Sequence, residues 1–245
     1  MAHQEYIRIL PDCDRAVLLI HGIVGTPDHF LPFLNLIPGD WSVCNILLEG
    51  HGGSTDDFSR ASMKKWKTQG ASVLDGPLAH CNKIIIVGHS MGTLIAIGEA
   101  LRRPKRITSL FLLQVPRRVR VRLKTAFCAG LLPFGIVLKP VEGMKADSGV
   151  DLDPRLWKYL GWIPRFAELL AECARIRRAL PALKVPCQAF QSGRDELVSM
   201  KSCRELARCD AVKITVLPEC DHFVYQGENL RLLLQRFQEL FAEAE

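Results

Sequence analysis

Short runs of apolar residues alternate with amphipathic stretches along most of the chain. The predicted strands are residues 16–20, 42–48, 83–87, 107–113, 185–191 and 211–217, and the clearest predicted helices are residues 63–78, 200–208 and 228–243. An uninterrupted run of β-branched and other apolar residues is typical of a strand that is buried on both faces of a sheet. Because strand, loop and helix alternate, the pattern predicts an α/β fold. We expect a doubly wound, mostly parallel sheet with its functional loops at the carboxyl ends of the strands.

The pattern changes between residues 115 and 183. This segment contains many prolines and arginines and shows little strand character. Apolar residues gather at 127–138 and recur with helical spacing at 156–170. A structureless loop of about 70 residues is uncommon in a compact domain. We therefore expect residues 115–183 to form a small helical cap, inserted into a core made of residues 1–114 and 184–245.

The predicted strand at 83–87 leads into the motif Gly88-x-Ser90-x-Gly92, and a helical pattern follows. A sharp turn from strand to helix strains the backbone of the serine, tolerates only small flanking residues, and lifts the hydroxyl above the sheet. The same turn places the backbone N–H of Met91 at a helix N-terminus, where it can stabilise an oxyanion. The motif therefore predicts Ser90 as a nucleophile and Met91 as an oxyanion donor. The alternative is an ordinary turn in which Ser90 caps the helix.

A second glycine loop follows the predicted strand at 16–20. Residues 21–27 read His-Gly-Ile-Val-Gly-Thr-Pro and open a helical stretch. In a sheet of this kind, the second oxyanion donor comes from the loop beside the nucleophile turn. We expect the backbone N–H of Ile23 to be that donor. The alternative is a loop shaped for helix packing alone.

A nucleophilic serine needs a base to take its proton and an acid to orient that base. Asp195 and His222 follow the last two predicted strands, so the order along the chain is serine, acid, histidine. Adjacent residues on an extended loop point in different directions, which disfavours Asp221 as the acid, whereas Glu196 remains an alternative to Asp195. His51 lies in a glycine turn before the nucleophile, which favours a role in loop support.

Among the remaining histidines, two belong to the turn motifs and three lack supporting context. The first two are His21 and His89, and the other three are His3, His29 and His80. Only His222 lies after the last strand and just before the final helix. We therefore expect His222 to be the base.

The composition is consistent with the predicted α/β fold and limits the class of protein. The 245 residues, 48% hydrophobic and 24% charged, fit one large α/β domain. The N-terminus has no apolar core of signal-peptide length, and no run approaches the roughly 18 apolar residues of a membrane span. We expect a cytoplasmic protein without stable membrane insertion. The nine cysteines form no C-x-x-C pair and no zinc pattern, so we expect reduced thiols and no metal.

The net charge of +6 is not evenly spread, because basic residues crowd into two groups, at 117–124 and 175–178. No nucleic-acid-binding motif accompanies them, which argues against nucleic acid as a partner. They form either a solvated face or the rim of a pocket that favours anionic substrates. The sequence leaves the oligomeric state open, including a homo-oligomer.

Five motifs together resemble the α/β-hydrolase superfamily, and in particular the compact bacterial carboxylesterases and the monoacylglycerol-lipase-like esterases with a small helical cap. The motifs are His21-Gly22-Ile23-Val24-Gly25, Gly50-His51-Gly52-Gly53-Ser54, Gly88-His89-Ser90-Met91-Gly92, Asp195-Glu196-Leu197-Val198 and Asp221-His222. The resemblance covers nearly the whole chain except the cap, which matches only in position and size. It implies a Ser90, Asp195 and His222 triad with Ile23 and Met91 as oxyanion donors.

One position departs from that resemblance. Family members often carry glycine three residues before the acid, where this chain has Ser192. The next residue, Gly193, lies three before Glu196, which keeps Glu196 as the alternative acid.

The expected activity is cofactor-free hydrolysis of a small-molecule ester through an acyl-enzyme. The apolar residues of the predicted cap favour short-to-medium acyl esters or monoacylglycerols. An acyl-CoA thioesterase, in which the arginines of the predicted cap would meet phosphates, is the first alternative. A C–C bond hydrolase and a cofactor-free haloperoxidase use the same triad. Both are further alternatives, because fold does not fix function. A hydrolase-derived ligand-binding protein with a vestigial triad is the alternative from outside the enzymes.

Overall fold

The computed structural model describes residues 3–116, 149–195 and 197–242. Within these residues seven strands form one sheet, in the order β1-β3-β2-β4-β5-β6-β7. The strands are β1 (Tyr6–Arg8), β2 (Arg15–Ile20), β3 (Ser42–Ile46), β4 (Lys83–His89), β5 (Ile107–Leu113), β6 (Cys187–Ser192) and β7 (Val212–Leu217). Strands β2 to β7 are parallel, and β1 pairs antiparallel with β3 at one edge. The predicted α/β fold with a mostly parallel sheet is confirmed.

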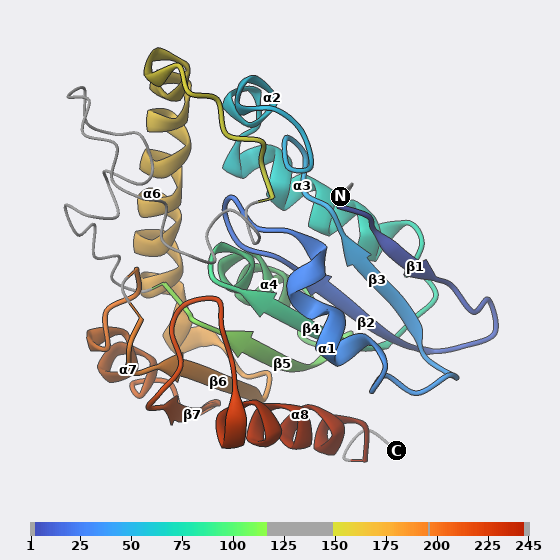
Figure 1. The fold of residues 1–245 in the computed structure, drawn as a ribbon. Helices are drawn as coiled ribbons and strands as arrows, with labels where there is room; N and C mark the ends of the chain where they lie inside the picture. The colour runs from blue at the N-terminus through green and yellow to red at the C-terminus, as the bar shows by residue number, and fades with distance from the viewer. Residues whose placement is uncertain (1–2, 117–148, 196, 243–245) are drawn as a thin grey trace.

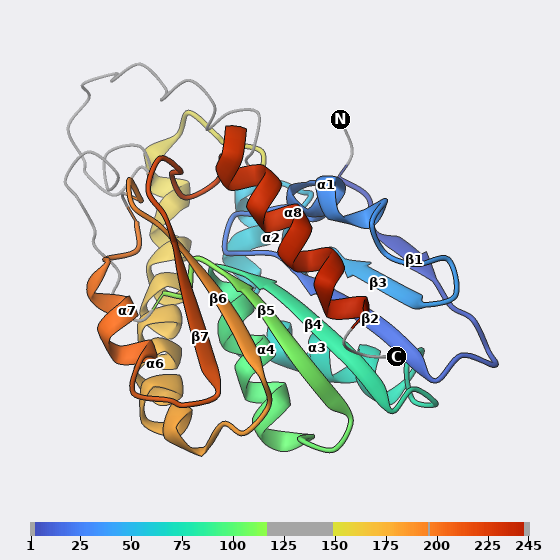
Figure 2. The ribbon, with the colours of Figure 1, turned by 90° about the horizontal axis from the view of Figure 1, so that it is seen from below.

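Helices cover both faces of the sheet (Figures 1 and 2). Along β2, Leu18 and Ile20 point to one core cluster, whereas Val17 and Leu19 point to the other. This alternation follows from the period of two along a strand. The cluster of Leu18 includes side chains of α3 (Met63–Asp75), α4 (Met91–Arg102) and α6 (Ile163–Ala179). The cluster of Val17 includes side chains of η1 (Pro27–Phe30), α1 (Leu31–Leu34) and α8 (Gly227–Ala242).

The predicted helices are present with small differences at their ends. The helix predicted at 63–78 ends at Asp75, because the chain turns at Gly76. The helix predicted at 200–208 is α7 (Lys201–Leu206), and the one predicted at 228–243 is α8. The short helix α2 (Thr55–Arg60) had no counterpart in the prediction.

Part of the predicted cap packs on the core. The described residues from 149 to 183 form η2 (Leu156–Trp162), α6 and η3 (Leu180–Ala182). Helix α6 packs against α3 and α4, and the Nε1–H of Trp162 donates to the Thr55 carbonyl at 3.0 Å. The boundaries of a separate cap at 115–183 therefore stay a prediction. The apolar stretch 127–138 and the basic group at 117–124 lie outside the described residues.

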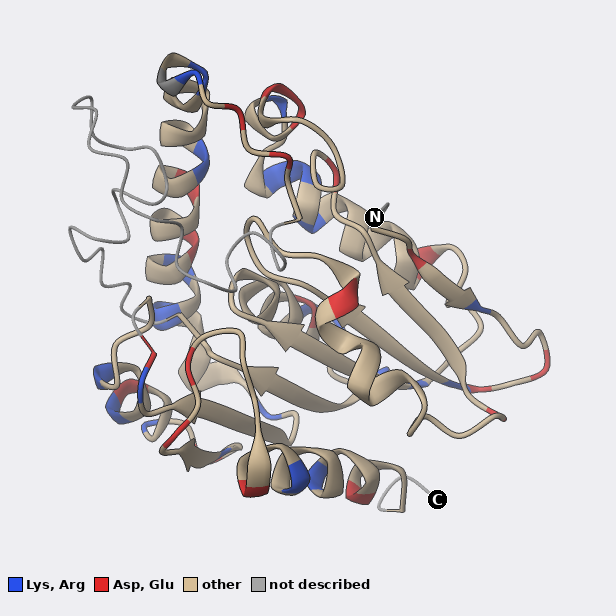
Figure 3. Cartoon of the chain, viewed as in Figure 1, with Lys and Arg blue, Asp and Glu red and all other residues tan. Residues whose placement is uncertain are grey.

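The second basic group lies in the last turns of α6, and acidic residues precede it on the same helix (Figure 3). The buried carboxylate of Glu172 lies 2.7 Å from an Arg175 guanidinium nitrogen and 3.2 Å from the Lys67 Nζ. Two cations around one buried carboxylate satisfy its charge, and the one on α3, Lys67, joins the two helices. Arg175 has its charge partner within α6, three residues before it.

Two expectations from composition can be compared with the described residues. Their eight cysteines are free thiols, six of them buried, and Cys128 lies outside this part of the chain. None of the described helices is both long and apolar enough to cross a membrane.

Candidate active site

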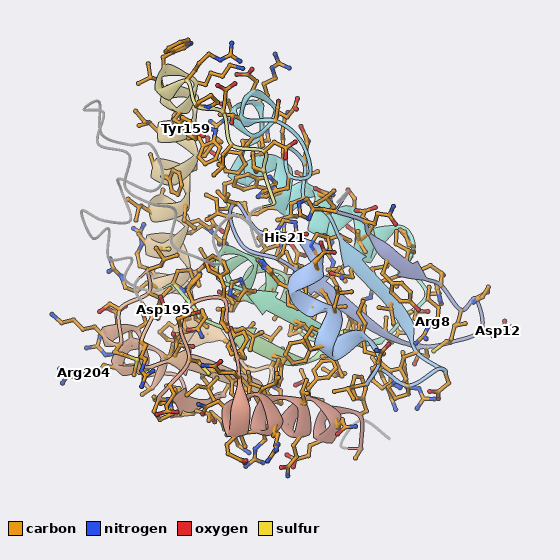
Figure 4. The ribbon with its side chains drawn as sticks, viewed as in Figure 1. Arg8, Asp12, His21, Tyr159, Asp195 and Arg204 are labelled. Atoms are coloured by element: carbon orange, nitrogen blue, oxygen red, sulfur yellow. The ribbon has the colours of Figure 1, made fainter. Side chains whose placement is uncertain are left out.

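The candidate site lies at the carboxyl ends of the parallel strands. The chain runs from β2 outward to β3 and then returns to β4 on the other side of β2, so the strand order reverses between β2 and β4. Ligands bind at such a reversal point in open parallel sheets, because the loops there diverge and leave a crevice. The loop after β2 carries Ile23, and the turn after β4 carries Ser90. In Figure 4 the labelled His21 and Asp195 lie at this end of the sheet.

Ser90 occupies a strained turn between β4 and α4. Its φ of 49° and ψ of −119° are rare for a residue with a side chain. The turn brings α4 so near to β2 that a Cβ at Gly92 would lie 2.0 Å from the Ile20 carbonyl oxygen. The Ser90 side chain makes no capping hydrogen bond to α4. The helix-cap alternative therefore does not describe this serine.

Asp195 and His222 are in direct contact. The Nδ1 of His222 lies 2.7 Å from Oδ2 of Asp195, and both side chains are buried. The other oxygen of Asp195, Oδ1, accepts hydrogen bonds from the backbone N–H groups of Leu197 and Val198, at 2.7 and 2.8 Å. One oxygen thus fixes the carboxylate in its loop while the second one holds the imidazole.

Asp221 accepts the same kind of backbone hydrogen bonds as Asp195 but lies in an exposed position. Its Oδ1 accepts from the backbone N–H groups of Phe223 and Val224, at 2.9 and 2.7 Å. The residue is exposed, and its carboxylate shapes its own loop. Asp195 is the acid that touches His222, whereas Glu196 lies outside the described residues.

His89 connects His222 to the serine turn. Its Nε2 lies 2.9 Å from the His222 carbonyl oxygen, so this nitrogen carries the proton and donates it. The rings of His89 and His222 are 5.0 Å apart, and burial holds the pKa of His89 well below the usual range of histidine. A neutral His89, adjacent in sequence to Ser90, therefore fixes the backbone of His222 beside the turn.

The sequence interpretation missed His29. Its ring lies 5.6 Å from that of His89 and 5.5 Å from that of Phe223. His29 lies in η1, which the sequence places far from the predicted triad, and no motif connects it with Ser90. Only the fold brings this histidine to the site.

A polar network connects the ends of β5 and β6 and was also missed. The Gln114 side chain accepts from the Ser192 backbone N–H at 2.9 Å and donates to the Ser192 hydroxyl and to the Tyr225 hydroxyl. Gln114 has a φ of 57° and is fully buried. The serine at position 192, where the sequence departs from the family pattern, thus has a partner just beyond the end of the neighbouring strand.

Two buried histidines hold the predicted oxyanion loop, residues 22–25. The Nε2 of His21 accepts the Leu48 N–H at 3.0 Å, so its Nδ1 carries the proton and donates to the Gly22 carbonyl at 2.8 Å. A Cβ at Gly22 would lie 3.0 Å from the Cβ of Ser90. The Gly22–Ile23 peptide therefore runs directly beside the serine. Met91 is the first residue of α4, next to Ser90.

His51 is the second of these histidines. It lies 6% exposed, with its ring centroid 4.7 Å from that of His21. Burial lowers the pKa of His51 to about 4 and holds that of His21 well below its usual range. Both rings are therefore neutral at neutral pH.

We expect the free energy of unfolding to decrease as the pH is lowered below about 6.5. The reason is that His51 binds a proton there in the unfolded chain but not in the folded protein. Full stability is present above the unfolded pKa and is lost as the pH falls toward 4. Between pH 7.5 and 5.5 the wild type should lose about 1 kcal/mol more than His51→Gln, measured by urea unfolding. An equal loss in both proteins would contradict this, because it would show that His51 binds protons as readily in the folded state as in the unfolded chain.

Among the described residues, no group of three or more His, Cys, Asp or Glu side chains could hold a metal ion.

A model of the family described as "Alpha/beta hydrolase family" matches residues 17–233. Over 92 residues, 36% of each chain, the sequence is 33% identical to a thermostable monoacylglycerol lipase of Bacillus sp. (strain H-257). Over 113 residues it is 31% identical to a pimeloyl-[acyl-carrier protein] methyl ester esterase of Neisseria meningitidis serogroup B / serotype 15 (strain H44/76). This second match covers 46% of the chain and 41% of the relative. Both matches thus span well under half of these curated relatives.

Solved structures are similar over nearly the whole chain. A structure from work on two metagenome-derived lipolytic enzymes has a TM-score of 0.77 at 16% identity and covers 99% of this chain and 98% of its own. The monoacylglycerol lipase of Paleococcus ferrophilus has a TM-score of 0.70 at 16% identity, covering 99% of this chain and 100% of its own. At such low identity the likeness describes the fold alone.

Proposed function

The chain belongs to the alpha/beta hydrolase family, and from this premise we propose that it is a serine carboxylic-ester hydrolase. The observation that carries the proposal is the contact of 2.7 Å between Asp195 and His222, with His89 joining His222 to the turn of Ser90. A strained serine, a histidine beside its turn and a buried carboxylate behind that histidine are the parts that acyl transfer needs.

In the proposed mechanism, His222 takes the proton of Ser90 as the serine oxygen attacks the ester carbonyl. Asp195 holds the imidazole in the tautomer whose Nε2 is free to accept that proton. The backbone N–H groups of Ile23 and Met91 stabilise the negative charge on the carbonyl oxygen. His222 then returns the proton to the leaving alcohol, and water releases the acid from the acyl-enzyme by the same steps.

The proposed substrates are short-to-medium acyl esters or monoacylglycerols. The curated relatives are named for a monoacylglycerol and for a methyl ester, both of which are oxygen esters of carboxylic acids. The acyl-CoA alternative depended on arginines that would meet phosphates. In the structure Arg175 pairs with Glu172, and the group at 117–124 lies outside the described residues.

The test is a comparison of p-nitrophenyl esters from acetate to palmitate with acyl-CoA thioesters of matched chain length. We expect kcat/KM to be highest for an ester of short or medium chain length and lower for every thioester. A preference for acyl-CoA would contradict the ester assignment. Turnover of neither class would favour the ligand-binding alternative.

A further inference from the structure

The oxyanion loop, residues 22–25, forms hydrogen bonds with groups elsewhere in the chain that take no part in the proposed chemistry. Val24 has a left-handed backbone with a φ of 56°. Its N–H donates to Nε2 of His51 at 3.1 Å, and its carbonyl accepts the Gly149 N–H at 2.8 Å. Both polar groups of one strained residue are therefore tied to other parts of the chain.

We propose that His51 is a positioning residue of the oxyanion hole, acting through its hydrogen bond to the backbone N–H of Val24. This inference rests on the proposed ester hydrolysis and extends it to a residue that touches no reacting atom. Gly149 holds the opposite side of the same residue and completes the support.

The orientation of the His51 ring is fixed by its surroundings. Its Nδ1 donates to the Leu48 carbonyl at 3.1 Å, which leaves the lone pair of Nε2 for Val24. The rings of Phe58 and Trp66 pack around it at 5.2 and 5.5 Å. The titratable group that faces it is His21, itself buried and neutral. The acceptor is thus rigid.

The hydrogen bond matters because it fixes the peptide plane that joins Ile23 to Val24, and the neighbouring plane with the Ile23 N–H is linked to it through the dihedral angles of one shared Cα. The donor proposed for the oxyanion is the N–H of Ile23, one residue before Val24. A φ above zero is unfavourable for a β-branched residue such as valine, so the loop needs external bonds to keep this conformation. Without the His51 acceptor, the peptide between Ile23 and Val24 can rotate. The preceding peptide, which carries the Ile23 N–H, shares the Ile23 Cα with it, so the N–H is no longer held toward the developing charge.

The segment around Gly149 supports the same loop from the other side. A Cβ at residue 149 would lie 1.7 Å from the Gly25 carbonyl oxygen, so only glycine fits there. The Gly149 carbonyl accepts the Gly52 N–H at 2.6 Å, which connects this segment to the turn that carries His51. The oxyanion loop, the His51 turn and residue 149 therefore form one hydrogen-bonded unit.

Two substitutions at position 51 distinguish the hydrogen bond that the side chain accepts from Val24 from the one that it donates to Leu48. In His51→Gln the side-chain oxygen reaches the place of Nε2 and can accept from Val24. In His51→Asn the shorter amide reaches only the place of Nδ1, so the bond to Leu48 can persist while the bond to Val24 is lost. Removing one oxyanion donor lowers kcat by roughly 10²- to 10³-fold, and misdirecting it should cost somewhat less.

We therefore expect His51→Asn to lower kcat on a p-nitrophenyl ester by about 10- to 100-fold with KM within about twofold of wild type. His51→Gln should stay within about threefold of wild type in both constants. Affinity for an alkylboronic acid, which forms a tetrahedral adduct with the serine, should fall in parallel with kcat. The control for lost stability alone is Phe241→Leu, a buried position of α8 in the other core cluster.

Equal kcat in the two His51 variants, or an equal loss in Phe241→Leu, would overturn the inference. If His51→Asn does not fold, His51→Ala removes the same acceptor, and there an unchanged kcat would overturn the inference. A wild type without esterase activity would overturn the proposed function and the inference together. An active wild type whose His51→Asn variant keeps its kcat would overturn the inference alone.

Discussion

Replacement of Ser90 by alanine is expected to lower kcat for ester hydrolysis by about 10⁴-fold or more. Without the hydroxyl no acyl-enzyme can form, and the remaining rate comes from substrate binding and from the oxyanion donors. The variant should fold, because alanine removes one oxygen that caps no helix. Kinetics with p-nitrophenyl esters measure the loss, and circular dichroism and urea unfolding measure the fold.

Ser72 offers the matched control. It is exposed on α3, so Ser72→Ala makes the same chemical change away from the site. We expect its kcat and KM to equal those of wild type. Retention of esterase activity by Ser90→Ala, after a contaminating esterase has been excluded by the mock purification, would contradict the role of Ser90.

The second large effect is expected for Asp195→Asn, with a loss in kcat of about 10³- to 10⁴-fold. The asparagine oxygen can keep the hydrogen bonds to the N–H groups of Leu197 and Val198. Its amide nitrogen then faces Nδ1 of His222 and donates to it. The proton of the imidazole moves to Nε2, so His222 can no longer accept the proton of Ser90.

Asp221→Asn is the control for this change. Its oxygen can also keep the local bonds, to the N–H groups of Phe223 and Val224, and its carboxylate does not touch the imidazole. We expect kcat within about twofold of wild type. A large loss in Asp221→Asn, or a small one in Asp195→Asn, would reverse the assignment of the acid.

The core of the fold could be predicted because its signals are local. The strand before Ser90 is visible in the sequence as a continuous apolar run, and the turn as the Gly-x-Ser-x-Gly motif that follows it. The strand β1 gave no such signal, because it has three residues and lies exposed at the sheet edge. Helix α2 is largely polar and buries only Thr55 and Phe58, so its pattern resembles a loop. Its capping box of Ser54 and Asp57 was the available clue.

The candidate site could be predicted in part for the same reason. Asp195 and His222 follow two strands in a set order. Because parallel strands end at the same edge of the sheet, residues that follow them come close together. The partners of His51, His29 and Gln114 come from other strands and loops, and no pattern within their own segments encodes those contacts. For His51 the glycine turn indicated loop support, but Val24 as its partner required the fold.

The most direct test of the central claim is to map the residue that reacts with a serine-directed fluorophosphonate. Trypsin should release residues 84–102 as one peptide, in which Ser90 is the only serine. We predict a single phosphonyl adduct on this peptide by mass spectrometry, and none on Ser90→Ala. Absence of labelling in the folded wild type, or an adduct that persists in Ser90→Ala, would contradict a nucleophilic Ser90.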